Sequence, residues 1–212
     1  MLRTVLLLGI ALAFVGCAFG RKQDYLQAQP ALGSTGQGSL SLGVQDLRPY
    51  VVNHEKDETF VGLQRGGYGN PFDVSTQSKQ PLADDMAKVL AKALSRSAGT
   101  VQTVRLPPAL DKPAVIRALQ SSHPDRSLLL SLHEWKSDTY MGTKLVYDAE
   151  MEVIDPHGRS VARRRIQGED DLGGAFWDPQ GHAQEAAPLA FKRKMEELFS
   201  GEIAEALGKA AR

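Results

Sequence analysis

The histidines and carboxylates of this chain do not form a recognisable catalytic or metal-binding motif. A zinc-binding helix places two histidines four residues apart, as in HExxH, so that both imidazoles share one face. No such pair occurs among the five histidines, which lie far apart in the sequence: His54, His123, His133, His157 and His182. A GxSxG motif for a nucleophilic serine is also absent. We therefore expect no catalytic residues, no cofactor and no metal site, and hence not an enzyme.

Two smaller groups of polar residues could carry chemistry but can also be explained by structure alone. Glu169-Asp170-Asp171 is an acidic run that would attract a divalent cation, but it lacks the alternating oxygen ligands of a calcium loop. We interpret it as a solvated strand end. His133 and Glu134 are adjacent, and adjacent strand residues point to opposite faces. These two can act together only if a bulge intervenes.

The only thiol, Cys17, follows a leader that is typical of secretion. Arg3 precedes an uncharged apolar run over residues 5–15, and the small Gly16 ends it. The run is shorter than the roughly 20 apolar residues of a membrane-spanning helix. Residues 14–17 (FVGC) resemble a bacterial lipobox, in which the leader is cut before the cysteine and the thiol carries a diacylglyceryl group. The alternative is an ordinary secreted protein with an unpaired cysteine.

The leader and the composition divide the chain into three parts. Residues 1–16 are expected to be a lipoprotein signal peptide. Residues 17–38 would form the lipidated cysteine and a flexible tether rich in Gln, Gly, Ser and Pro, and residues 39–212 a single periplasmic domain. By resemblance to enterobacterial lipoproteins, Ala18 in place of Asp favours the outer membrane.

The charge of the mature chain is balanced. Residues 1–16 contain one of the 25 basic residues and none of the 25 acidic ones, which leaves 24 against 25. A protein without a basic field has no electrostatic means of attracting nucleic acid, so we expect no nucleic-acid partner. With Cys17 carrying lipid there are no disulfides, and stability must come from an apolar core.

Hydrophobic periodicity predicts an α+β domain. The expected elements are strand 39–47, an apolar piece at 60–63, helix 79–97, strand 101–106, helix 112–120, strands 127–135, 145–153 and 161–168, and helix 187–208. The glycine-rich residues 65–72 lack a GxxxxGK pattern and are read as a turn. Early strand–helix alternation followed by a meander predicts a mixed sheet with two or three helices on one face, a three-strand meander and a C-terminal helix.

Charges on the last two strands suggest how they pair. In the simplest hairpin register Arg163 faces Glu150 and Arg165 faces Asp148. Such complementary cross-strand pairs contribute about 0.2–1 kcal/mol each. They account for the run of three arginines without a phosphate site.

Two glycine-flanked aromatic segments are the strongest candidates for a binding surface. They cover residues 135–142 and 172–179, and together they hold both tryptophans of the chain. Because aromatic residues at strand ends are frequent interface anchors, the candidate partner-binding residues are Trp135, Tyr140, Phe176 and Trp177. The alternative is that these residues pack over the edge of the core.

The chain resembles the YajG-type family of Gram-negative outer-membrane lipoproteins. The resemblance rests on loose motifs: Gly43-Val44-x-Asp46-Leu47-Arg48, Val61-Gly62, the helix from Pro81 to Leu94, Tyr147-Asp148, and Gly168-x-Asp170-x-Leu172-Gly173. It implies an outer-membrane location facing the periplasm, and no catalytic residues. The order of elements is also similar to that of periplasmic adaptor domains.

These features predict an outer-membrane lipoprotein whose non-enzymatic domain binds another cell-envelope component. Its membrane contact would be the lipid on Cys17, and its expected partner is an envelope protein. One alternative is a lipid-handling accessory lipoprotein of an envelope transport system, which would require a sizeable apolar groove between helix and sheet. Another is an accessory protein of flagellar or cell-wall assembly.

Overall fold

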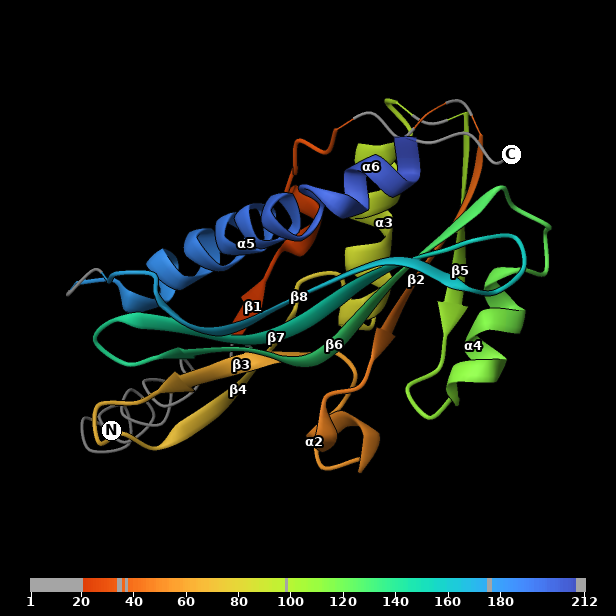
Figure 1. The fold of residues 1–212 in the computed structure, drawn as a ribbon. Helices are drawn as coiled ribbons and strands as arrows, with labels where there is room; N and C mark the ends of the chain where they lie inside the picture. Colours follow the sequence, from red (N-terminus) through yellow and green to blue (C-terminus); the bar gives the residue numbers. More distant parts are fainter. Residues whose placement is uncertain (1–20, 34–35, 37, 98, 175–176, 209–212) are drawn as a thin grey trace, which may run out of the picture.

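The computed structural model describes residues 21–33, 36, 38–97, 99–174 and 177–208 (Figure 1). The predicted site residues Cys17 and Phe176 lie outside these ranges. The strands are β1 (Arg21–Gln23), β2 (Ser39–Asp46), β3 (Phe60–Arg65), β4 (Pro71–Thr76), β5 (Thr100–Leu106), β6 (Arg126–Thr139), β7 (Thr143–Ile154) and β8 (Ser160–Asp171). The helices are the 3-10 turn η2 (Tyr25–Gln27), α2 (Pro49–Val52), α3 (Leu82–Leu94), α4 (Lys112–Leu119), α5 (Pro179–Leu198) and α6 (Glu202–Gly208).

The described strands form one mixed sheet of eight strands, which confirms the predicted fold class. Its hydrogen-bonded order is β1-β4-β3-β6-β2-β5, and β7 and β8 continue from β6. The long strand β6 is the centre of the sheet. One edge of β6 pairs with β7 along nearly its whole length, and the other edge pairs first with β2 and then with β3. The strands β6, β7 and β8 are the predicted meander.

The main core lies between the sheet and the helices α3, α5 and α6, which cover one face (Figure 1). The predicted stripe on α3 is confirmed, since Leu82, Met86 and Leu90 are fully buried. A smaller cluster on the opposite face joins α4 to the sheet through Val115 and Leu119. In the described part of the chain, no helix has the length and apolar character that crossing a bilayer requires.

Residues 21–28 of the segment predicted as a tether belong to the fold, so the tether prediction is wrong for these residues. β1 pairs in parallel with β4, and Tyr25 is completely buried. The Tyr25 ring meets Phe191 of α5 edge to face, with centroids 5.8 Å apart. The Tyr25 ring thus adds a large apolar burial to the strand pairing that holds this mostly polar segment.

The predicted C-terminal helix is two helices. Asp178 caps α5 by accepting a hydrogen bond from Gly181 N at 2.8 Å, well before the expected start at residue 187. The first turns carry no apolar stripe, which is why periodicity missed them. Gly201 has a positive φ of 62° and separates α5 from α6, because this left-handed conformation ends a helix.

The β7–β8 register differs from the simplest hairpin by two residues. Glu150 lies opposite Arg165, after a register shift beside Ile154. The predicted ion pairs nevertheless form diagonally: Arg165 binds Asp148 at 2.6 Å, and Arg163 Nε lies 3.4 Å from Glu150. Diagonal neighbours on a sheet are still within reach of long arginine side chains.

Candidate functional site

A bulge in β6 decides where three candidate residues point. The pairing of β6 with β7 shifts between Leu132 and Glu134, so one extra residue enters β6. Leu132 and Trp135 are three positions apart, yet both are fully buried in the main core. The bulge therefore leaves His133 and Glu134 together on the other face of the strand. Adjacent strand residues normally point to opposite faces, so this bulge is the condition under which the two could act as a pair.

Glu134 is engaged in contacts other than with His133. Glu134 Oε1 accepts a hydrogen bond from the Tyr50 hydroxyl at 2.5 Å and from the backbone N of Trp135 at 2.9 Å. Burial raises the pKa of Tyr50, while the charge of Arg48 opposes this rise. The carboxylate thus has a structural partner, and its geometry does not indicate acid–base chemistry.

The bulge also corrects one predicted binding residue. Trp135 is buried completely, so in this structure it does not offer its ring to a partner. Its Nε1 donates to the Tyr25 hydroxyl at 3.1 Å, and its ring packs edge to face on Phe191. Burial raises the pKa of Tyr25 to about 12, so that hydroxyl stays neutral at physiological pH. Trp135 is therefore a core residue that joins β6 to η2 and α5.

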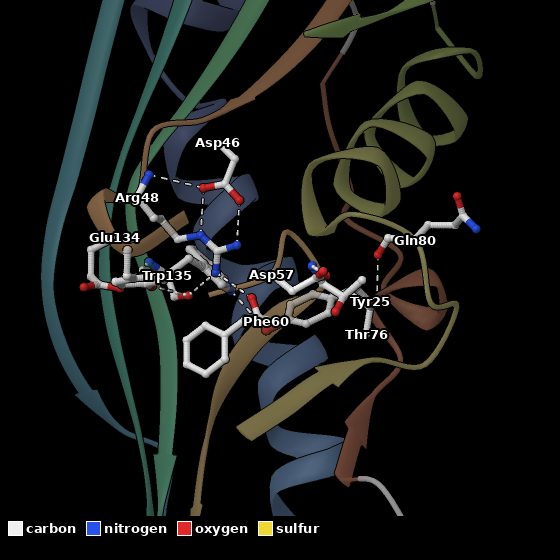
Figure 2. Close-up of polar contacts among 11 residues, drawn as sticks. Tyr25, Asp46, Arg48, Asp57, Phe60, Thr76, Gln80, Glu134 and Trp135 are labelled. Carbon is white, nitrogen blue, oxygen red and sulfur yellow. Dashed lines mark hydrogen bonds and ion pairs between the residues drawn. The ribbon is translucent and has the colours of Figure 1, made fainter. Parts of the chain in front are cut away.

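A buried ion pair lies where β6 changes neighbours (Figure 2). β6 pairs with β2 as far as Leu132 and with β3 from Ser137 onward. Between these stretches, the guanidinium of Arg48 donates from Nε to Asp46 Oδ1 at 2.8 Å and from Nη2 to Asp46 Oδ2 at 2.6 Å. The two side chains are only 0% and 2% exposed.

The same guanidinium satisfies two backbone carbonyls. Arg48 Nη1 donates to Phe60 O at 2.7 Å and to Trp135 O at 3.0 Å, as Figure 2 shows. Burial opposes the charge on Arg48, but hydrogen bonding to Asp46 outweighs it and raises the pKa of Arg48. A planar fork with five donors suits such a set of acceptors. The enclosed ion pair joins β2, β3 and β6, and its geometry indicates a structural role.

The acidic run at the end of β8 is divided among separate contacts. Glu169 pairs with Lys144 at 2.6 Å, and Asp170 pairs with Lys194 at 2.9 Å. Asp171 accepts from the backbone N of Gly173. Within the described ranges, no group of three or more His, Cys, Asp and Glu residues is placed to hold a metal ion.

Exposed apolar side chains gather at one end of the sheet. Among the described residues, eight large apolar side chains are exposed, and five of these lie at this end. We call this set the aromatic end: Tyr68 (103% exposed), Trp177 (93%), Met141 (64%), Tyr140 (43%) and Phe72 (41%). Ordinary soluble surfaces scatter such residues singly, so a gathered set is a candidate contact surface.

Parallel pairing of β3 with β6 brings the tips of two hairpins together at the aromatic end. Gln64 lies opposite Thr139, so the β3–β4 tip stands beside the β6–β7 tip. The Tyr140 hydroxyl donates to Gly67 O at 3.3 Å, which links the two tips directly. Arg65, the last residue of β3 before its tip, forms an ion pair at 2.5 Å with Asp138, which precedes Thr139 in β6.

The segment before α5 is held against the same tips. Thr143 N donates to Gly173 O at 2.7 Å, and Leu172 N donates to Thr143 O at 2.8 Å. The Nε2 of His182 in the first turns of α5 lies 3.0 Å from Leu172 O. Trp177 is therefore attached, within three residues of Gly174, to the end of the sheet that carries Tyr140.

The aromatic end contains two of the predicted partner-binding residues, Tyr140 and Trp177. Sequence reasoning missed Tyr68 and Phe72, which sit in and beside the glycine-rich turn, and it did not single out Met141. The available signal was an aromatic residue in each of two turn segments, Tyr68 and Tyr140. Only the sheet topology places these turns side by side.

A groove lies elsewhere, between β1, η2 and α5. Its volume is about 840 Å³. The groove is lined mainly by polar and charged side chains, including Lys22, Gln184 and Lys192. The space between helices and sheet is filled by the main core. Neither feature resembles the apolar groove that an acyl chain requires.

Comparisons with known proteins find similarity at the level of the fold. No family model matches the sequence, and no curated protein matches it. A solved structure of a DUF330-family protein from Xanthomonas campestris is similar over 89% of this chain and 94% of its own, with 14% identity and a TM-score of 0.51. At this identity the similarity is one of fold alone.

Two further solved structures are similar at lower scores. The PelC dodecamer of Paraburkholderia phytofirmans has 13% identity and a TM-score of 0.41, with 82% of this chain and 95% of that chain covered. A lipoprotein of Neisseria meningitidis has 9% identity and a TM-score of 0.29, with 73% and 98% covered. Such scores support no statement about this chain. None of these similarities is specific to the YajG-type family, so that membership stays a prediction.

Proposed function

We propose that this protein is a lipid-anchored outer-membrane protein whose periplasmic α+β domain binds another component of the cell envelope. The observation that carries this proposal is the aromatic end, where five large apolar side chains stand exposed on three neighbouring segments. The lipobox-like residues before Cys17 support the anchor, and Ala18 supports the outer membrane. The proposed role is that of an adaptor or accessory protein without catalytic activity.

The polar interior supports a binding role over an enzymatic one. The buried Asp46–Arg48 pair is saturated by strand carbonyls, and Glu134 is held by Tyr50. An active site instead brings titratable groups together in a cleft that substrate can enter. The lipid-handling alternative is less favoured, because most residues that line the groove between β1, η2 and α5 are polar or charged.

The anchor is tested by the mass of the mature protein. We expect the wild-type chain to carry the mass increment of an acylated N-terminal cysteine, and Cys17→Ala to lack it. An identical lipid-free mass for both chains would contradict the proposed anchor.

The binding surface is tested by photo-crosslinking in whole cells. A photoreactive residue replaces Tyr140 or Trp177, and the matched control replaces the exposed Glu202 on α6, far from the aromatic end (Figure 1). We expect adducts from the two aromatic positions and none from residue 202. Equal yields from all three positions would mean that the aromatic end is not a binding surface.

A further inference from the structure

We infer that the aromatic end rests on the lipid surface of the membrane that anchors the chain, with Tyr68, Met141 and Trp177 in the headgroup region. The inference rests on the proposed lipidation of Cys17 and names the envelope component that this surface contacts. The membrane would then orient the domain as well as retain it.

The direction of β1 is the first argument. β1 runs parallel to β4, with Arg21 opposite Val74, and β4 begins at the β3–β4 tip with Pro71. Followed backward from Gln23 to Arg21, the chain therefore heads toward the aromatic end. At about 3.3 Å per strand residue, Arg21 lies about 10 Å from the level of Pro71.

The short connection to Cys17 is the second argument. Only residues 18–20 separate Cys17 from Arg21. A chain spans at most about 3.6 Å per residue, so the two Cα atoms lie within about 14 Å of each other. Because β1 is part of the sheet, acyl chains on Cys17 would hold this end of the domain close to the bilayer.

The types of side chain at the aromatic end are the third argument. Tyrosine and tryptophan combine an apolar ring with a polar tip, and both concentrate where the hydrocarbon of a membrane meets water. Tyr68 and Trp177 are the most exposed of these side chains, and they come from different segments, while Met141 lies on the β6–β7 tip. Contacts distributed over three tips suit a broad, flat surface.

Two basic side chains near the aromatic end, Arg65 and Lys144, are paired with carboxylates, so neither supplies a free charge for anionic lipid. Arg65 binds Asp138, and Lys144 binds Glu169. Asp171 adds a negative charge at the end of β8. We therefore expect docking on zwitterionic lipid without an anionic component.

The two tryptophans provide a direct test in the mature, lipidated protein. Trp177 is exposed at the aromatic end, whereas Trp135 is buried in the core and serves as an internal reference. The protein is reconstituted into phosphatidylcholine vesicles with either ordinary or brominated acyl chains, and bromine quenches only nearby tryptophans. The matched control is Trp177→Phe, which alters one exposed ring and retains Trp135.

In brominated vesicles the wild-type protein should lose the part of its fluorescence that comes from Trp177. This part equals the difference in fluorescence between wild type and Trp177→Phe in ordinary vesicles. The control should show no such loss. Wild-type protein that floats with the vesicles without quenching would overturn the docking inference and leave the anchor intact. Protein that fails to float would overturn the anchor and the inference with it. A photoreactive residue at position 177 that captures only a protein, and no phospholipid, would also refute membrane docking.

Discussion

Replacing Arg48 by methionine tests the role of the buried ion pair. Methionine approximates the volume of the side chain but removes every guanidinium donor to Asp46, Phe60 O and Trp135 O, and leaves Asp46 only the backbone N of residue 48. Asp46 would be left as an unpaired carboxylate at 2% exposure. Breaking a buried pair in this way costs about 3–5 kcal/mol. For a domain of this size each kcal/mol lowers Tm by about 2–4 °C, so we expect a fall of about 6–20 °C.

The assay is urea unfolding of a soluble chain that begins at residue 18. Fluorescence of Trp135 reports the transition directly, because its carbonyl accepts from Arg48 and its ring lies in the core. Arg48→Met, Asp46→Asn and the double variant complete a double-mutant cycle. The double variant should lose less than the sum of the single losses, since the second change removes a charge already left without its partner.

Arg48→Lys is the conservative control. Lysine keeps the charge but has one ammonium in place of a fork that serves four acceptor atoms. The stability of Arg48→Lys should lie between that of the wild type and that of Arg48→Met. A cost below about 1 kcal/mol for Arg48→Met, the range of an exposed pair, would refute the reasoning. If the stability losses of Arg48→Met and Asp46→Asn add up to the loss of the double variant, the two side chains are not coupled.

Three other substitutions test separate parts of the fold. Tyr25→Ala should cost about 3–5 kcal/mol in urea unfolding, as for a buried aromatic ring; an unchanged midpoint would mean that this segment is a tether. Gly62→Ala should lower Tm strongly because its Cβ would overlap β6, whereas Gly67→Ala, with open space around it, should not. Burial opposes ionisation of Glu152, but hydrogen bonds, above all from Lys112, outweigh it and lower its pKa. The stability it contributes is present above its unfolded pKa and is lost as pH falls through the lower folded value, so Glu152→Gln should destabilise at pH 7 and converge with wild type in acid; a constant difference across that range would contradict this assignment.

Local patterns predicted most elements because their apolar residues follow a regular period. The stripe on α3 and the alternation along β7 each face a core that the elements bury, so period and structure agree. The ion pairs between β7 and β8 were predictable from charge alone. Their exact register was not, because the shift beside Ile154 follows from backbone pairing and not from side-chain type.

The candidate site depended on tertiary structure for a comparable reason. Trp135 and Trp177 occupy similar glycine-flanked aromatic segments in the sequence, yet one is fully buried and the other is 93% exposed. The difference arises at the β6 bulge, which turns Trp135 into the core. No local pattern marks this bulge, since it satisfies the packing of Leu132 and Trp135 at the same time.

The class of fold was predictable from the sequence, which also shows the single cysteine and the balanced charge, while the secretion leader stays a prediction. These properties depend on composition and on short-range periodicity, which the chain carries locally. That β1 and Tyr25 belong to the domain, and that turns far apart in the sequence form one aromatic end, became visible only in the folded structure. Both outcomes depend on strand pairings between distant residues, whose partners are selected by burial in the assembled sheet.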